Sequence, residues 1–232
     1  MYHWVEDKDF LKRSYSYCAD IVNQLVQNLK RYEIDSEMYI VGSKKRNMIT
    51  QNANESIDYD FNLLIKNADD FHDAHELKEV IRKAFNEVLY NNDLKDCDDS
   101  TSALTTKHIA FLDGNKTDFY IDLCIVKRNS CGLHRLIHQK TGFSSLDSWI
   151  WNQVSNSHDL REKEESLKPD HWQEVRDIYI HKKNTYLKRP NDHDHPSFIC
   201  YIEAVNEIYD KVKPNRASNY IGWSNPFLSQ TR

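Results

Sequence analysis

The chain has 232 residues, of which 39% are hydrophobic and 29% charged, a composition typical of folded globular proteins rather than disordered ones. Its formal charge of −5 disfavours an enzyme that tracks along DNA or RNA, because such proteins usually carry a basic excess. The N-terminal segment contains no apolar run, no stretch reaches the roughly 18 apolar residues of a membrane span, and the five cysteines include no C-x-x-C pair. We therefore expect a cytoplasmic protein without a signal peptide, a membrane segment or a disulfide framework.

The first part of the chain alternates helical and extended patterns. Apolar residues recur at three- and four-residue steps in two segments, which predicts two amphipathic helices. Two other segments are short, apolar and bounded by polar or turn-forming residues, which predicts strands. In chain order, the expected elements are a helix over 7–32, a strand over 38–41, a polar loop over 44–56, a strand over 57–65 and a helix over 74–90.

Two further strands are expected around a hairpin turn. Segments 103–112 and 118–126 are rich in apolar residues, and Asp113-Gly114 between them is a good turn signal. After this second strand the pattern becomes helical. We therefore expect a mixed α/β domain over 1–126 and a helical domain over 127–232. Within the latter, helical spacing covers 146–154, 171–186 and 196–212.

Three aspartates on two of the expected strands are candidates for a catalytic metal site. Asp58 and Asp60 are two positions apart, so their side chains project from one face at about 6.6 Å along the strand. Asp122 has apolar neighbours on both sides, as a side chain in the middle of a strand would. Asp118 shares the face of Asp122 but lies next to the hairpin, so we expect a solvated charge there. Clustered carboxylates on a rigid face suit magnesium, and two such cations can clamp both oxygens of a phosphoryl transfer.

The turn at Gly42 and Ser43 suits the phosphates of a nucleotide. Small residues let the backbone approach a ligand closely, and a turn leaves N–H groups free to bind phosphate oxygens. Ser43 adds a hydroxyl donor. A Gly-Ser pair is common in turns, so this signal becomes informative only together with the aspartates.

The order of these motifs resembles the DNA polymerase β-like nucleotidyltransferase superfamily. That superfamily is marked by G-S, then h-D-h-D-h, then h-D-h, where h is an apolar residue. Here the matching segments are Gly42-Ser43, I-D-Y-D-F around Asp58 and Asp60, and I-D-L around Asp122. The resemblance covers about 38–126. It implies an α+β fold, with a nucleotidyltransferase-type mixed sheet flanked by helices and a C-terminal helical unit that walls the cleft.

The resemblance also implies roles for the site residues. Asp58 and Asp60 would ligate both metals, Asp122 would ligate the metal that activates the acceptor hydroxyl, and Ser43 would bind the β- or γ-phosphate. The implied cofactor is magnesium or manganese. The implied donor is a nucleoside triphosphate, ATP among the candidates, with release of pyrophosphate.

The loop after Ser43 departs from the superfamily's pattern. Many members carry a second pair of small residues a few positions later, whereas Lys44, Lys45 and Arg46 follow here. We place Lys44 with Gly42 and Ser43 in the expected triphosphate site. The alternative is that the basic residues are solvated loop charges.

These observations favour a metal-dependent nucleotidyltransferase that moves a nucleoside monophosphate to a hydroxyl acceptor. The acceptor is a small molecule, a protein, a tRNA end or a second nucleotide, and we expect neither extended nucleic-acid binding nor a membrane partner. One alternative is a catalytically inactive nucleotide-binding interaction module, which the altered Gly-Ser loop would suit. Another is an unrelated α/β binding protein whose D-x-D is accidental.

Several histidines and tryptophans have two interpretations each. His134 and His138 are four apart, as metal-binding pairs on a helix are, but no matching ligand follows, so satisfied or solvated histidines are expected. Trp149, Trp151 and Trp172 could stack on a nucleobase, but packing between helices is the role expected for each of them. Other candidates to line the cleft are Thr105, Thr106 and Lys107.

Overall fold

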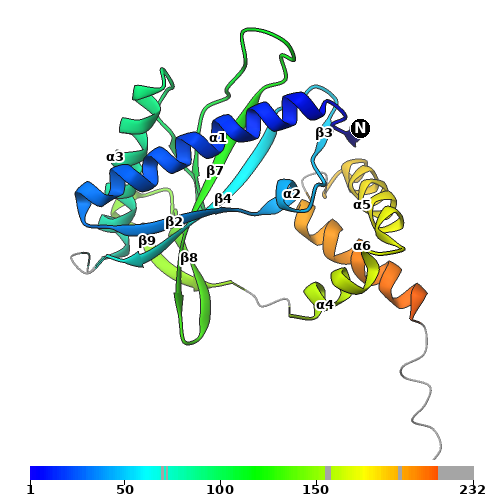
Figure 1. Cartoon of the computed structure of the whole chain (residues 1–232). Helices are drawn as coiled ribbons and strands as arrows, with labels where there is room; N and C mark the ends of the chain where they lie inside the picture. Colours follow the sequence, from blue (N-terminus) through cyan, green and yellow to red (C-terminus); the bar gives the residue numbers. More distant parts are fainter. Residues whose placement is uncertain (69–70, 72, 155–157, 193–194, 214–232) are drawn as a thin grey trace, which may run out of the picture. The chain divides into compact units, whose positions relative to one another are not determined.

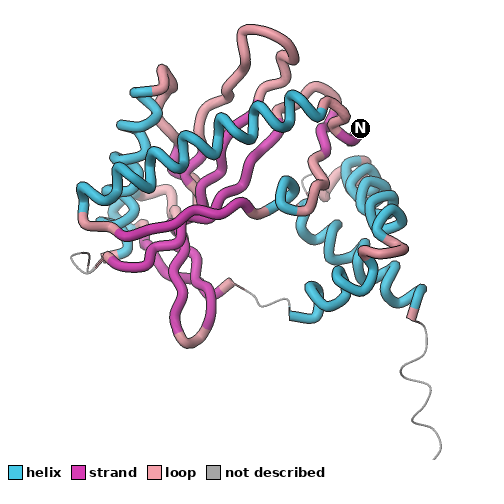
Figure 2. The backbone as a smooth tube through the Cα atoms, in the orientation of Figure 1, coloured by secondary structure: helices cyan, strands magenta, loops and turns pink. Residues whose placement is uncertain are grey.

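The computed structural model describes residues 1–68, 71, 73–154, 158–192 and 195–213. The chain divides into two compact units, Met1–Asn156 and Ser157–Arg232. Figure 2 shows strands and helices in the first unit, whereas the described part of the second unit is helical. Among the described residues, no helix combines the length and the apolar character needed to cross a membrane.

A seven-stranded mixed sheet forms the centre of the first unit (Figure 1). Its strands are β2 (Asp35–Ile40), β4 (Ile57–Asn67), β5 (Asp98–Asp99), β6 (Leu104–Thr105), β7 (Phe119–Asn129), β8 (Gly132–Gln139) and β9 (Ser148–Gln153). The strand order is β2-β4-β7-β6-β5, and β8 pairs with both β7 and β9. Strands β4 and β7 run parallel, and the other pairs are antiparallel. The mixed α+β fold expected from the sequence is confirmed.

The two central strands present chemically different faces. Alternate residues of β4, among them Tyr59, Phe61 and Leu63, are fully buried on one face. Each large apolar side chain buried in this way contributes about 1.5–3 kcal/mol to folding. Helices α1 (Lys8–Leu29) and α3 (Ala74–Asn91) pack over this face and share its apolar core. The opposite face of the same strands carries Asp58 and Asp60.

Both covering helices begin at an aspartate cap. Asp7 accepts a hydrogen bond from the Phe10 backbone N–H at 2.9 Å, and Asp73 accepts one from the His75 N–H at 2.9 Å. Such caps satisfy backbone donors that have no partner within the helix. The two helices confirm the predictions over 7–32 and 74–90. A short η1 helix (Lys30–Tyr32) continues α1 toward β2.

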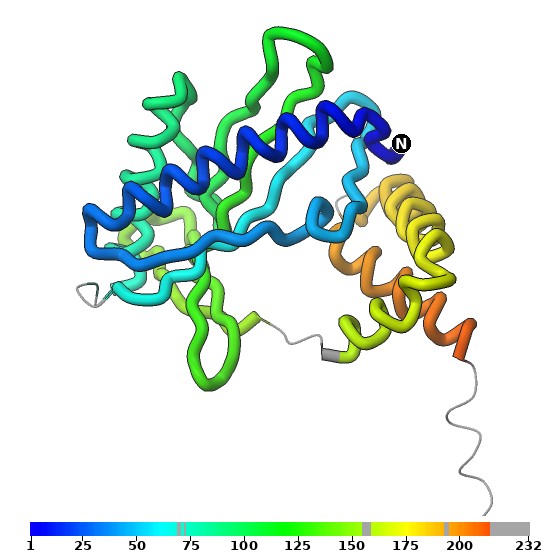
Figure 3. The backbone as a smooth tube through the Cα atoms, viewed as in Figure 1, coloured from blue at the N-terminus to red at the C-terminus, as the bar shows by residue number. Residues whose placement is uncertain are grey.

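The chain then reaches the candidate phosphate loop. In Figure 3 the blue segment runs through α1 into β2 and on to a single helical turn, α2 (Gly42–Lys45), before the chain returns along β4. The expected turn after the 38–41 strand is therefore one helical turn. The predicted polar loop over 44–56 contains a short strand, β3 (Thr50–Asn52), which pairs with β1 (Tyr2–Trp4).

The second unit contains α4 (His158–Leu167), α5 (Trp172–Leu187) and α6 (Ser197–Val212). Helix α6 packs against both α4 and α5. Helices α5 and α6 confirm the predictions over 171–186 and 196–212, whereas the mostly polar α4 was not predicted. Their core includes Leu167, Val175, Tyr201 and Val205.

The predicted helix over 146–154 is wrong. Apolar residues in this segment fit helical steps, but Trp149 and Trp151 also alternate, and the chain forms η2 (Ser144–Leu146) followed by strand β9. Six residue pairs join β9 to β8. Cross-strand pairing therefore overrides an ambiguous local pattern. Because β8 and β9 belong to the sheet, the division between the compact units falls after Asn156, later than the expected boundary after residue 126.

The predicted strand over 103–112 is also mostly wrong. Only Leu104 and Thr105 form β6, and beyond them a single bridge joins Ile109 to Phe119. Asp113-Gly114 therefore lies in a longer loop rather than in a two-residue hairpin turn. The antiparallel pairing of this segment with β7 is as predicted.

Candidate active site

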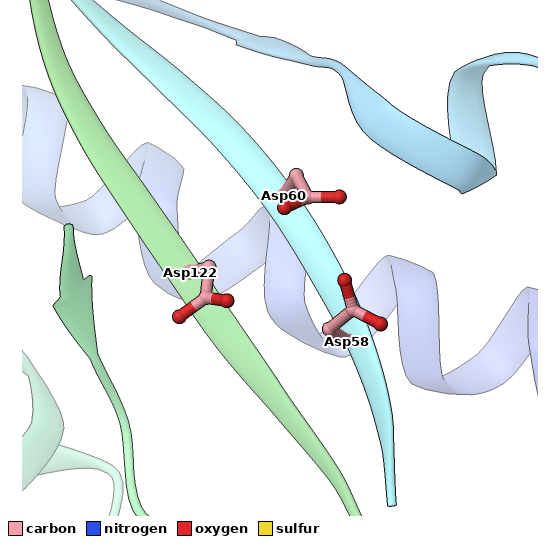
Figure 4. A group of neighbouring side chains, drawn as sticks. All are labelled: Asp58, Asp60 and Asp122. Atoms are coloured by element: carbon pink, nitrogen blue, oxygen red, sulfur yellow. The ribbon is translucent and has the colours of Figure 1, made fainter. Parts of the chain in front are cut away.

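Asp58, Asp60 and Asp122 converge on one face of the sheet (Figure 4). Each offers one carboxylate oxygen such that these ligand atoms all lie within 4.8 Å of one another. Asp58 and Asp60 come from β4, and Asp122 comes from the neighbouring strand β7. The structure thus brings together the three carboxylates that the sequence singled out.

The register of two parallel strands fixes this arrangement. Asp60 lies directly opposite Asp122, and Asp58 lies opposite Tyr120. Directly opposite residues project from the same face of a sheet, and a spacing of two keeps Asp58 and Asp60 on that face as well. The buried apolar residues on the other face, such as Phe61, hold the register because a slip by one position would expose them.

Burial and mutual repulsion perturb the acids. Burial first, and then the negative charges of Asp58 and Asp122, together raise the pKa of Asp60 to about 7. Burial also raises the pKa of Asp122, while a hydrogen bond donated by Thr105 to its Oδ1 at 2.5 Å acts in the opposite sense. Such clustered carboxylates are costly unless a proton or a cation neutralises them.

The donor set fits a divalent cation of the magnesium type. All three side chains offer hard carboxylate oxygens from rigid strands. Among the described residues, this is the one group of acidic, histidine or cysteine side chains that lie close enough together to share an ion. Magnesium and manganese prefer such oxygens, whereas zinc sites favour nitrogen and sulfur. The raised pKa of Asp60 shows the electrostatic strain that a bound cation would relieve.

The metal-free protein should show a pH dependence set by Asp60. The folded chain keeps this proton up to about pH 7, whereas the ordinary value is 3.8. The folded state then binds more protons than the unfolded state between these values, so stability falls as pH rises from about 4 to about 7. Added Mg²⁺ should raise the melting temperature by several degrees at pH 8 and by less at pH 6, because protons compete for the same oxygens. Thermal melts with and without chelator across this range check both trends, and an equal shift at both pH values would contradict them.

Gly42 packs against the face of the sheet that carries Asp58 and Asp60. Its φ is +63°, and a Cβ at this position would lie 2.7 Å from Asp60 Cγ and closer still to Oδ2. The backbone just before Gly42 is hydrogen-bonded to the same aspartate: the Val41 N–H donates to the Asp60 carbonyl at 2.9 Å. Glycine is therefore required both for the backbone conformation and for the close approach to the carboxylate.

The remaining residues of this loop are partly accessible. Ser43 is half-buried, and its carbonyl accepts a hydrogen bond from the Met48 N–H at 2.9 Å. The Lys44 ammonium lies 4.9 Å from the centre of the Tyr15 ring, and burial lowers its pKa. Arg46 donates to the Gly42 carbonyl at 3.0 Å. Lys45 is exposed, as a solvated loop charge would be.

A cavity of about 590 Å³ opens beside Asp122. Thr105, which pairs with Asp122 across the strands, lines it together with Tyr120 and His108, whose rings stack at 5.7 Å. The cavity has the size of a small-ligand site. Thr106 and Lys107 also line this cavity, so all three residues suggested by the sequence as lining a cleft are found in it. Lys107 forms an ion pair with Asp98, which is another lining residue.

Asp118 lies outside the carboxylate cluster. It precedes β7, its side chain is 47% exposed, and its nearest basic partner is His108 at 3.6 Å. A solvated charge at the strand end was expected.

The histidine and tryptophan candidates also lie elsewhere. His138 is buried on β8, where its ring bonds with Asp99 at 2.7 Å and with Asp147 at 3.1 Å, so it is a satisfied histidine. Trp149 stacks on His138 at 4.2 Å and, like Trp151, packs against the apolar core. Core packing, the role expected for these tryptophans, is therefore observed, but they pack from strand β9 and not between helices. Trp172 belongs to α5 in the second unit.

Sequence reasoning missed Arg135. It lies on β8, opposite Val126, and its positive charge lowers the pKa of Asp60. No motif marks it, because a helical pattern was expected after residue 126. Arg135 would have been found if the 132–139 segment had been interpreted as a strand, with side chains alternating between its two faces.

Comparison with known proteins gives a fold but no sequence relative. No protein-family model and no curated protein matches the chain. The structure of Escherichia coli MS115-1 CdnC with ATP is similar, with a TM-score of 0.53 and 17% identity, over 91% of this chain and 63% of that one. Vibrio cholerae DncV, a cyclic AMP-GMP synthase, has a TM-score of 0.52 and 12% identity, over 77% of this chain and 46% of that one. A 3′-deoxy GTP-bound E. coli DncV has a TM-score of 0.51 and 13% identity, over 76% and 46%.

The chain therefore has the fold of these CdnC and DncV structures. It spans about half to two-thirds of the length of these structures. At such identities the similarity concerns the fold. The chemistry has to be argued from the residues of this chain.

Proposed function

We propose that the protein is a metal-dependent nucleotidyltransferase that moves a nucleoside monophosphate from a nucleoside triphosphate to a hydroxyl acceptor, with release of pyrophosphate. The observation that carries the proposal is the convergence of three carboxylate oxygens within 4.8 Å on adjacent parallel strands. The nucleotidyltransferase fold of the chain supports it. If the D-x-D motif were accidental, nothing would explain why Asp122 lies directly opposite Asp60.

Each carboxylate has a role in the proposed reaction. Asp58 and Asp60 would hold both magnesium or manganese ions, and Asp122 would hold the ion that activates the acceptor hydroxyl. When bound, two such ions supply neutralisation of the phosphate charge and a lowered pKa of the acceptor hydroxyl. Asp122 orients that hydroxyl, and Thr105 fixes the carboxylate of Asp122 through their 2.5 Å hydrogen bond.

The loop beside Asp60 holds the triphosphate in this proposal. Gly42 brings the backbone against Asp60, so this loop would lie next to phosphates held at the three carboxylates. Ser43 contributes its hydroxyl, and Lys44 contributes a cation to the β- and γ-phosphates. The half-burial of both side chains leaves atoms available for these contacts.

The acceptor would approach from the side of the three carboxylates away from Gly42 and Ser43. In-line transfer places the attacking oxygen opposite the leaving pyrophosphate. Gly42 adjoins β4, and β7 lies beyond it with the cavity of about 590 Å³ next to Asp122. We place the acceptor hydroxyl there. Among the open acceptor classes, the fold neighbours favour a second nucleotide, since one DncV structure contains the linear intermediate 5′ pppA(3′,5′)pG.

Label transfer tests the proposal. Purified protein is incubated with each α-³²P nucleoside triphosphate, MgCl₂ and a nucleotide mixture or cell extract. We expect labelled product with pyrophosphate release, and none after chelation of the metal. Triphosphate that binds in a metal-dependent way but is never transferred would instead support the catalytically inactive module. Absence of metal-dependent triphosphate binding would contradict both.

A further inference from the structure

Arg135 shares the face of the sheet that carries the three aspartates. It lies directly opposite Val126 on β7, four positions beyond Asp122, so both side chains project from one face. Leu133, two positions earlier on β8, packs on the cluster that contains Val126, which confirms this orientation. Arg135 also lowers the pKa of Asp60, so its charge is felt at the metal-binding face.

The guanidinium of Arg135 has no partner in the part of the chain that the structure describes. Its Nε is buried without a hydrogen bond, and no side chain forms an ion pair with it there. Two other cations of this unit form ion pairs with acidic side chains: Lys78 with Asp99 at 2.5 Å and Lys66 with Glu37 at 2.6 Å. A partly buried guanidinium without partners is costly, and a bound anion would remove that cost.

The strand order tells which anion Arg135 can meet. Across the sheet, β2, which leads into Ser43, is followed by β4 and β7, and both β6 and β8 pair with the far edge of β7. Thr105 of β6 lies opposite Asp122, and Arg135 of β8 lies opposite Val126, further along the same edge. Ser43 and Arg135 therefore stand on opposite sides of the Asp60–Asp122 pair. A triphosphate bound at Ser43 leaves Arg135 across β7, on the same edge as the acceptor cavity beside Asp122 but outside the lining of that cavity.

We infer that Arg135 binds a phosphate group of the acceptor, so that the acceptor is a phosphate-bearing molecule. This inference rests on the proposed function and deepens it. Arginine suits the role because its planar fork forms two parallel hydrogen bonds with phosphate oxygens. A cationic acceptor is disfavoured by the same charge.

Binding measurements test the inference separately from catalysis. Protein loaded with a non-hydrolysable triphosphate and Mg²⁺ is titrated with AMP and GMP, and in parallel with adenosine and guanosine. We expect the wild type to bind the monophosphates about tenfold or more tightly than the nucleosides, as one charge-assisted contact implies. Arg135→Met, which keeps the apolar stem, should lose this preference but keep its affinity for the triphosphate. Arg135→Lys should restore part of the preference.

Arg31→Met removes one exposed positive charge from η1 and is the matched control; it should retain the phosphate preference. The inference is overturned if the wild type shows no preference for phosphorylated compounds, or if Arg135→Met keeps it. A loss of triphosphate affinity in Arg135→Met equal to the loss of monophosphate affinity would also overturn it, since the residue would then serve the donor. Failure of the proposed function looks different, because the wild type would then not bind the triphosphate with Mg²⁺.

Discussion

Asp60→Asn should lower nucleotidyl transfer by at least about a thousandfold while leaving the protein folded. A neutral amide binds divalent cations weakly, and Asp60 lies opposite Asp122 and two positions from Asp58 on β4. The same change removes a buried negative charge that Asp58 and Asp122 repel. The metal-free variant should therefore melt at the same temperature as the wild type or higher at pH 8. Label transfer and thermal melts measure the two effects.

Asp118→Asn is the matched control for this variant. It removes the same charge from an exposed aspartate next to β7, outside the cluster. We expect wild-type transfer rates from it. Near-normal transfer by Asp60→Asn would contradict the proposed role of Asp60, and unfolding of that variant at pH 8 would contradict the repulsion argument.

Gly42→Ala should lower transfer by at least about a hundredfold, because a misplacement of about 1 Å at a reacting centre has an effect of that size. The added Cβ would lie 2.7 Å from Asp60 Cγ, so either the loop or the carboxylate has to move. The backbone at φ +63° adds about 1–2 kcal/mol of strain for any residue with a Cβ. Transfer assays and denaturant unfolding separate the displacement from the strain.

Gly114→Ala measures the effect of backbone strain alone, without close packing of the added Cβ. Gly114 has a φ of +72°, but a Cβ there would meet nothing nearer than the Arg13 Nη1 at 3.8 Å. We expect a similar strain of about 1–2 kcal/mol with transfer unchanged. If the two alanine variants behaved alike in the transfer assay, the close packing of Gly42 on Asp60 would not matter for activity.

The helices and the site strands were predictable because their local signals agree with their tertiary environment. The apolar stripes of α1 and α3 have helical spacing and face the core. In β4 the alternation of aspartates with Tyr59 and Phe61 matches a strand with one buried face. Local pattern, burial and register all point to the same structure there.

The β6, β8 and β9 region was not predictable in the same way. The segment around Trp149 and Trp151 fits both helical and extended periods, and its pairing with β8 decides between them. The 103–112 segment looks extended, but only two of its residues join the sheet. Arg135 is a lone cation with no motif, so its place near Asp60 follows from strand order, a property of the folded chain.

The most direct test is anomalous X-ray diffraction from crystals of the protein with Mn²⁺ and a non-hydrolysable nucleoside triphosphate. The proposed function predicts manganese bound by Asp58, Asp60 and Asp122, with the triphosphate against Gly42 and Ser43. Ordered triphosphate with manganese bound elsewhere, and none at these three carboxylates, would contradict it.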